Sequence, residues 1–152
     1  MSHRIDHFAA APAAMKALGG VYGYVASSGL DPVLIDLVNL RASQINGCAY
    51  CIDMHTRDLI KKDVTIDKIA LVPVWREALP LFSKEEQAAL AWTEVVTRIA
   101  DAGAPDDAYE ATLAVFGDKG TVDLTVAIGL INAFNRLGIS FHATPAAVAN
   151  AA

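Results

Sequence analysis

Two cysteines and a histidine with regular spacing are the residues of this chain best suited to chemistry. Cys48 and Cys51 are its only cysteines, and His55 follows four residues after the second. If Asn46-Gly47 opens a helix, the three side chains fall at positions i, i+3 and i+7, so one helical face presents them together. The pattern therefore favours thiol redox chemistry.

The expected helix would activate both thiols in different ways. Cys48 would lie in the opening turn, where free N–H groups and the helix dipole stabilise a thiolate. Cys51 would have the imidazole of His55 one turn away to take or return its proton. The spacing makes Cys51 the candidate for the first attack on a substrate, whereas the dipole favours Cys48. The sequence leaves both assignments open.

Two other interpretations of the cysteines compete with redox chemistry. Free cysteines pack well as small buried hydrophobes. Zinc would need a fourth ligand beyond these three residues, and only Asp36 or His142 is a plausible source. The chain has no second CxxC motif to complete a structural site. We therefore predict a redox pair, with no metal and no cofactor.

The segment from Asp36 to Asp58 resembles the core motif of the alkylhydroperoxidase AhpD-like proteins within the carboxymuconolactone decarboxylase superfamily. The resemblance rests on LRASQINGC (40–48) and CIDMHT (51–56), with weaker support from AWTE (91–94) and INAFNRL (131–137). It implies an all-helical, oligomeric thiol peroxidase, in which an acidic residue, two cysteines and a histidine form a proton relay. By this likeness, the relay consists of Asp36, Cys48, Cys51 and His55.

One position departs from the family motif. The family usually has glutamate where this chain has Asp36, twelve residues before Cys48. Aspartate keeps the charge, but its carboxylate reaches about 1.5 Å less far, so the relay could need an additional water. Without the resemblance, Asp36 reads as a solvated helix carboxylate.

The resemblance also implies a reaction cycle and its partners. A thiolate would attack a hydroperoxide to give a sulfenic acid, and the second cysteine would then form an intramolecular disulfide. An external dithiol or protein reductant would restore the thiols. The rivals are a lactone decarboxylase, as in the other branch of the superfamily, and a non-enzymatic redox-sensing or zinc-binding module.

Composition predicts one apolar domain that associates with copies of itself. The 152 residues fit a single domain, 1–152, in which we expect about 1–8 and 145–152 to be flexible. Hydrophobic residues make up 54% and charged residues 19%, a more apolar balance than usual. Either one helix is wholly buried or subunits pack together, and we predict a homo-oligomer.

Charge and apolar patterning exclude some partners. The net charge of −5 argues against nucleic acid, because no basic stripe could displace counterions from phosphates. The longest apolar runs are shorter than the roughly 18 to 20 residues that span a membrane. The N-terminus lacks the charged region and continuous apolar core of a signal peptide. We therefore predict a cytoplasmic protein without a membrane partner.

The fold class predicted from the pattern is all-α, a compact helical bundle without the alternation of strands. Pro73 should break 65–75 into short turns. The stretch 121–137 is apolar nearly all round, which implies burial on several sides. The expected helices are 11–27, 32–46, 47–62, one from the Ser83–Glu86 capping box to about 101–103, one from Pro105 to a Gly117 cap, and 121–137.

Several other polar and aromatic residues have structural explanations. Asn132, Asn135 and Arg136 interrupt the most apolar helix and need partners, in loop carbonyls or across a subunit boundary, more than they suggest catalysis. Tyr50 points away from the cysteine face and reads as a packing or interface residue. Glu86 belongs to the capping box. The remaining histidines have no spaced neighbours and are interpreted as incidental: His3, His7 and His142.

Overall fold

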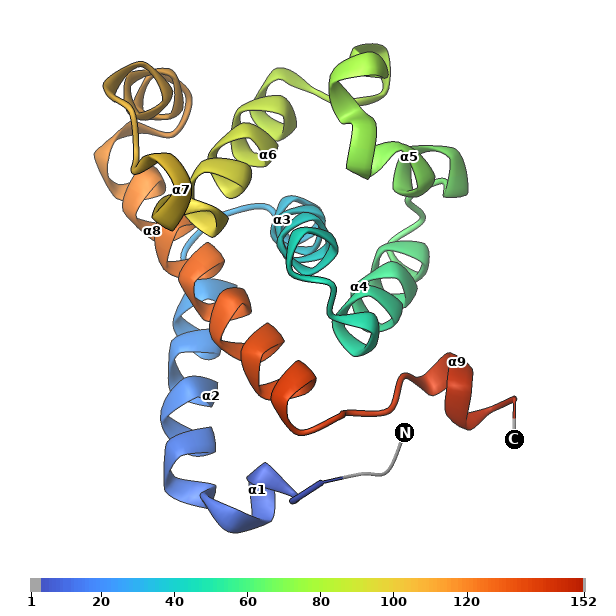
Figure 1. Ribbon diagram of the computed structural model, residues 1–152. Helices are drawn as coiled ribbons and strands as arrows, with labels where there is room; N and C mark the ends of the chain where they lie inside the picture. Colours follow the sequence, from blue (N-terminus) through green and yellow to red (C-terminus); the bar gives the residue numbers. More distant parts are fainter. Residues whose placement is uncertain (1–3, 152) are drawn as a thin grey trace.

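The computed structural model describes residues 4–151, and these form helices and turns without a strand (Figure 1). This confirms the all-α class. Two 3₁₀ segments, 72–77 and 79–81, separate α5 from α6. The helices are α1 His7–Ala10, α2 Pro12–Ala26, α3 Pro32–Asn46, α4 Ala49–Lys61, α5 Ile66–Leu71, α6 Lys84–Thr97, α7 Ile99–Ala102, α8 Asp106–Ser140 and α9 Ala146–Ala149.

Local sequence signals set most helix boundaries as expected. The Asp31 carboxylate caps α3 by accepting the N–H groups of Val33 and Leu34. Ser83 and Glu86 form the reciprocal capping box of α6. Pro73 lies in the 3₁₀ segment that follows α5, so 65–75 is a short α-helix and a 3₁₀ turn and not one continuous helix.

α8 is two helical stretches joined at Gly117. That residue has φ 65° and ψ −179°, a conformation open almost only to glycine. The break confirms the prediction that a helix beginning after Pro105 ends at Gly117, although the second stretch runs on to Ser140.

α3 lies at the centre of the bundle and packs against α4, α6 and α8 (Figure 1). Leu34 and Val38 face α6 and α8, within a cluster that includes Trp92, Leu124 and Ile128. Its other side joins a second cluster, made of Leu37, Leu40, Leu59, Ile69, Val72, Trp75, Phe82 and Leu90. Burial of 121–137 on several sides is confirmed, because Leu124, Ile128 and Ile131 are all buried, although Val122 is 60% exposed.

Glu94 ties three parts of the bundle together. Its carboxylate accepts from Arg41 Nε of α3 at 2.8 Å and from the Trp75 indole at 3.1 Å, and it also pairs with Arg76. Burial would raise the pKa of Glu94, but these donors outweigh it and lower the pKa below its usual value. Glu94 is therefore a structural anchor that fixes α6 against α3.

One helix among residues 4–151, α8, is long and apolar enough to cross a membrane by length and composition alone. A packed core helix meets the same two criteria. α8 packs against α2, α3 and α6. It also carries the buried polar residues Asp123 and Asn135.

Candidate active site

The cysteine pair lies where α3 turns into α4. Gly47, with φ 72° and ψ 31°, ends α3 in the left-handed conformation, and the N–H of Cys48 donates back to the Ser43 carbonyl at 3.0 Å. Cys48 is thus the N-cap of α4, one residue before the opening turn in which the sequence suggested it would lie. Its Sγ accepts the N–H of Cys51 at 3.3 Å.

The two cysteines form a disulfide, with their Cα atoms 5.4 Å apart. This confirms that the CxxC residues are close enough to bond to each other. Their side chains are almost completely covered, at 1% exposure for Cys48 and 2% for Cys51. Attack by a reductant on this disulfide therefore requires some local opening of the oxidised form.

α8 covers the disulfide with a glycine. A Cβ atom added to Gly138 would lie 3.2 Å from Cys48 Sγ and 3.7 Å from Cys51 Sγ. The absence of a side chain at Gly138 lets the α8 backbone approach the sulfur atoms closely. Sequence reasoning missed this residue, because a glycine inside an apolar helix gives no sign of what it faces.

Asp36 and His55 form a buried pair on neighbouring helices, α3 and α4. Their side chains lie 3.3 Å apart, from Asp36 Oδ1 to His55 Nδ1, and the two residues are only 7% and 6% exposed. The interpretation of Asp36 as a solvated carboxylate is therefore wrong. The shorter aspartate reaches the imidazole directly, so this contact needs no intervening water.

The pairing determines which imidazole nitrogen is available for chemistry. An ionised Asp36 accepts the proton on His55 Nδ1, which leaves the lone pair on Nε2. Nε2 is buried, and no group within residues 4–151 bonds to it. His55 follows Cys51 by one turn of α4, so its free nitrogen is suited to accept a proton.

Asp36 has a second partner that the sequence did not reveal. Lys62, the residue that ends α4, pairs with Asp36 Oδ2. Burial raises the pKa of the Asp36 carboxyl, but hydrogen bonds from His55 and Lys62 outweigh burial and hold the pKa below its usual value. A lysine at a helix end is too common to mark a site by residue type alone.

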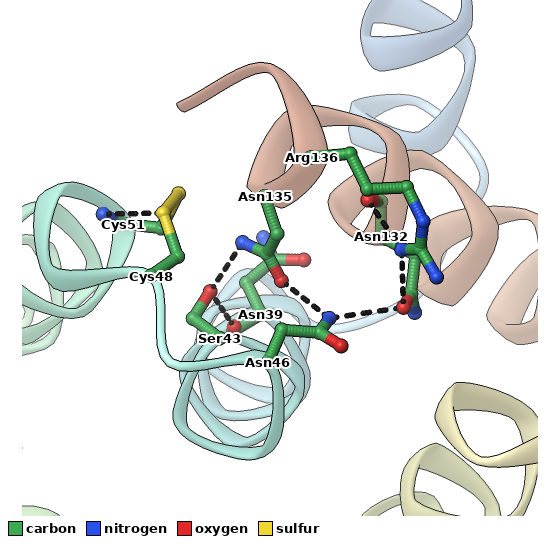
Figure 2. The surroundings of a disulfide bond; sticks show 8 residues. All are labelled: Asn39, Ser43, Asn46, Cys48, Cys51, Asn132, Asn135 and Arg136. Atoms are coloured by element: carbon green, nitrogen blue, oxygen red, sulfur yellow. Dashed lines mark hydrogen bonds between the residues drawn. A yellow bond between two sulfur atoms is a disulfide. The ribbon is translucent and has the colours of Figure 1, made fainter. Parts of the chain in front are cut away.

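A polar network beside the disulfide joins α3 to α8 (Figure 2). Asn135, which is fully buried, donates to Ser43 Oγ at 2.9 Å and accepts from Asn46 Nδ2 at 2.8 Å. Asn46 also donates to Asn132 Oδ1 at 3.0 Å, and Arg136 donates to the Asn132 carbonyl at 2.7 Å. Asn132, Asn135 and Arg136 therefore find their partners within the chain. The partners named here lie on α3 and on α8 itself, and not in loop carbonyls or across a subunit boundary as the sequence suggested.

The zinc site considered from the sequence is not assembled in this structure, in which the sulfur atoms bond to each other. The metal-ligating side chains that meet within residues 4–151 are Asp36, His55 and Asp58, with ligand atoms within 4.8 Å of one another. Since the Lys62 ammonium already pairs with Asp36, we assign no metal to this group.

The remaining candidates lie elsewhere. Tyr50 is 40% exposed on α4, as the helical geometry predicted. The ring of His7 stacks on Phe141, 5.2 Å between centroids. His142 follows α8, and His3 lies outside the described residues. Neither His7 nor His142 belongs to the Asp36–His55 group.

Comparison with known proteins identifies the class to which this fold and site belong. The family model for the carboxymuconolactone decarboxylase family matches residues 12–95. The uncharacterised protein YdfG of Bacillus subtilis is 36% identical over 140 residues, which cover 92% of this chain and 95% of YdfG. The chain therefore belongs to the carboxymuconolactone decarboxylase family.

Two further relatives place the chain on the AhpD-like side of that family. A crystal structure of a protein of unknown function from Agrobacterium tumefaciens, described as a candidate antioxidant defence protein AhpD, is 44% identical. It superimposes with a TM-score of 0.90, over 95% of this chain and 98% of that one. The alkyl hydroperoxide reductase AhpD of Koribacter versatilis is 39% identical over 46 residues, 30% of this chain and 24% of that protein. The chain is an AhpD-like family member.

Proposed function

We propose that this protein is a thiol-dependent hydroperoxide reductase, with Cys48 and Cys51 as its redox pair. The observation that carries the proposal is the disulfide between the two cysteines, on the same helix as a histidine that a buried carboxylate orients. The AhpD-like family membership supports peroxidase chemistry in general terms.

The cycle begins when a thiolate attacks the O–O bond of a hydroperoxide. A sulfur–oxygen bond forms, the O–O bond breaks, and the departing oxygen leaves as an alcohol or water after taking a proton. The second thiol then attacks the sulfenic acid sulfur, which releases water and forms the disulfide. An external dithiol, a small molecule or a protein, reduces the disulfide by two exchange steps and becomes oxidised itself.

His55 is the proton acceptor in this proposal. Asp36 holds Nδ1–H, so Nε2 can take a proton from a thiol and later return it to the leaving oxygen. We propose Cys51 as the attacking thiol, because His55 follows it by one helical turn. The N–H that Cys51 donates to Cys48 Sγ instead favours a thiolate at Cys48. Single serine variants separate the two assignments.

Peroxide consumption with a dithiol in excess tests the proposal. Each of C48S and C51S should lose multiple turnovers, and the variant that keeps the attacking thiol should still trap one sulfenic acid with a dimedone probe. H55Q should lower the rate by roughly 10² to 10⁴, the usual loss of a general base. H7Q, a histidine change outside the site, is the matched control. A parent protein that consumes no peroxide but releases carbon dioxide from a carboxylated lactone would support the decarboxylase rival.

We also propose that the protein is a homo-oligomer and that α2 contributes to its interface. This 15-residue apolar helix has only one buried residue, Val25. An apolar groove of about 660 Å³ lies between α2 and the end of α8, lined by residues such as Met15, Leu18 and Leu137. A second copy of the chain would cover this surface. We propose the cytoplasm as the compartment, since a dithiol-driven cycle needs reducing surroundings.

A further inference from the structure

Lys62 is a charged residue at the candidate site that the relay of two cysteines, histidine and carboxylate does not include. It bonds to one oxygen of Asp36, while His55 Nδ1 lies 3.3 Å from the other. The Asp36 carboxylate is thus shared between an ammonium group and an imidazole. The Lys62 side chain is 38% exposed, so it approaches the buried carboxylate from the surface.

The charges around His55 come from two helices and the residue that ends α4. Asp36 belongs to α3, Asp58 belongs to α4, and Lys62 is the C-cap of α4. Asp58 has its own cation, because Lys61 Nζ donates to its Oδ1 at 2.9 Å. The carboxylates of Asp36 and Asp58 therefore lie close to the imidazole, and each pairs with one ammonium group. Removal of Lys62 would leave the Asp36 charge without its ammonium partner.

A carboxylate beside a histidine has two effects on a proton relay. It fixes the tautomer by accepting Nδ1–H, but its negative charge also favours the protonated imidazolium, which cannot act as a base. A lysine on the second carboxylate oxygen opposes that protonation while leaving the hydrogen bond in place. The same ammonium also limits the positions open to the short Asp36 side chain.

We propose that Lys62 is a positioning residue for the proton relay: it holds Asp36 against His55 and opposes the protonation of the imidazole that the Asp36 charge alone would favour. This inference rests on the proposed hydroperoxide reductase function, since it assigns Lys62 a part in the same relay. Neither the Asp36 carboxylate nor the Lys62 ammonium group exchanges a proton with the substrate in this proposal.

Titration of the His55 ring by NMR tests the proposal independently of activity. The oxidised protein is used so that no thiol titrates in the same range, and H55Q assigns the signal. In K62M the titration midpoint of His55 should rise by about one pH unit, the low end of what a charge a few ångströms away causes. K62Q should give the same shift, and K62R, which keeps the charge, should give little.

The charge-matched control is K84M, which removes an exposed lysine from the first turn of α6. It should leave the midpoint where it is in the parent. In peroxide assays, the acid limb of the pH–rate profile of K62M should move to higher pH by the same interval. The rate on that limb should fall by up to about tenfold, and higher pH should restore it.

A His55 midpoint in K62M and K62Q that matches the parent and K84M would overturn the role of Lys62. If the midpoint shifts in K62M and K62Q but the parent protein shows no peroxidase activity, the electrostatic role of Lys62 stands and the proposed function is refuted. The two failures are therefore distinguishable.

Discussion

Replacing Asn135 with alanine should destabilise the protein by an amount that its contacts define. Asn135 is fully buried and makes two hydrogen bonds, to Ser43 Oγ and from Asn46 Nδ2. Each contributes about 1 kcal/mol net. Ser43 still donates to the Asn39 carbonyl at 2.7 Å, and Asn46 still donates to Asn132, so neither partner loses every bond.

The small void left by the amide adds to this loss, which gives about 2–3 kcal/mol in total. In a domain of this size, each kcal/mol lowers Tm by about 2–4 °C, so we expect a decrease of about 4–12 °C. Thermal unfolding of the oxidised protein, followed by far-UV circular dichroism, measures it.

The matched control is N150A, at the exposed end of α9. A Tm of N135A within about one degree of the parent would refute the reasoning, as would an equal loss in N150A. Because the Ser43 carbonyl accepts the Cys48 N–H, N135A should also be reduced faster by a dithiol than the parent is.

Three further predictions concern a charge, a backbone conformation and assembly. D36N should lower the rate of thiol oxidation at pH 7 by roughly 10² to 10⁴, with D67N, an exposed aspartate of α5, as the matched control and D36E at or above the parent rate. Because the folded protein lowers the pKa of Asp36, its carboxylate stabilises the fold above the unfolded pKa of about 3.9 and loses this effect as the pH falls through the folded value. The stability gap between parent and D36N, measured by urea unfolding, should therefore shrink below about pH 4, and a constant gap would contradict the assignment. G117A should cost about 1–3 kcal/mol, because φ 65° with ψ −179° strains any side chain; an unchanged urea midpoint would contradict this. Light scattering at micromolar concentration should give a multiple of the 16.1 kDa chain mass, and a monomeric mass would refute the proposed homo-oligomer.

The features that the sequence predicted well are those encoded within a few residues. The Asp31 cap, the Ser83–Glu86 capping box and the Gly117 break each depend on local backbone chemistry. The CxxC pair could also be predicted, because a spacing of three residues at the start of a helix brings two thiols within bonding distance.

The features that escaped prediction depend on packing between distant segments. Asn135 and Ser43 are 92 positions apart, and Gly138 meets the sulfur atoms only because α8 crosses the start of α4. Lys62 reaches Asp36 from 26 positions away. No spacing rule links such residues, so their partners become visible only in the folded chain.

Burial of Asp36 was also beyond residue-level reasoning. A carboxylate on a helix is usually solvated. For this reason residue type alone predicted an exposed Asp36, although its neighbours in the sequence are apolar. Its two cationic or donor partners, which come from α4 and its C-cap, make the buried position tolerable.

The most direct test of the central claim is a single-turnover oxidation of the fully reduced protein by one equivalent of a hydroperoxide. Stopped flow measures the rate, and mass spectrometry identifies the product. The account predicts that both thiols disappear at least roughly 10²-fold faster than free cysteine reacts. The product should be two hydrogens lighter and carry an intramolecular Cys48–Cys51 bridge. Oxidation no faster than that of free cysteine, or a product with two titratable thiols or only intermolecular bridges, would contradict it.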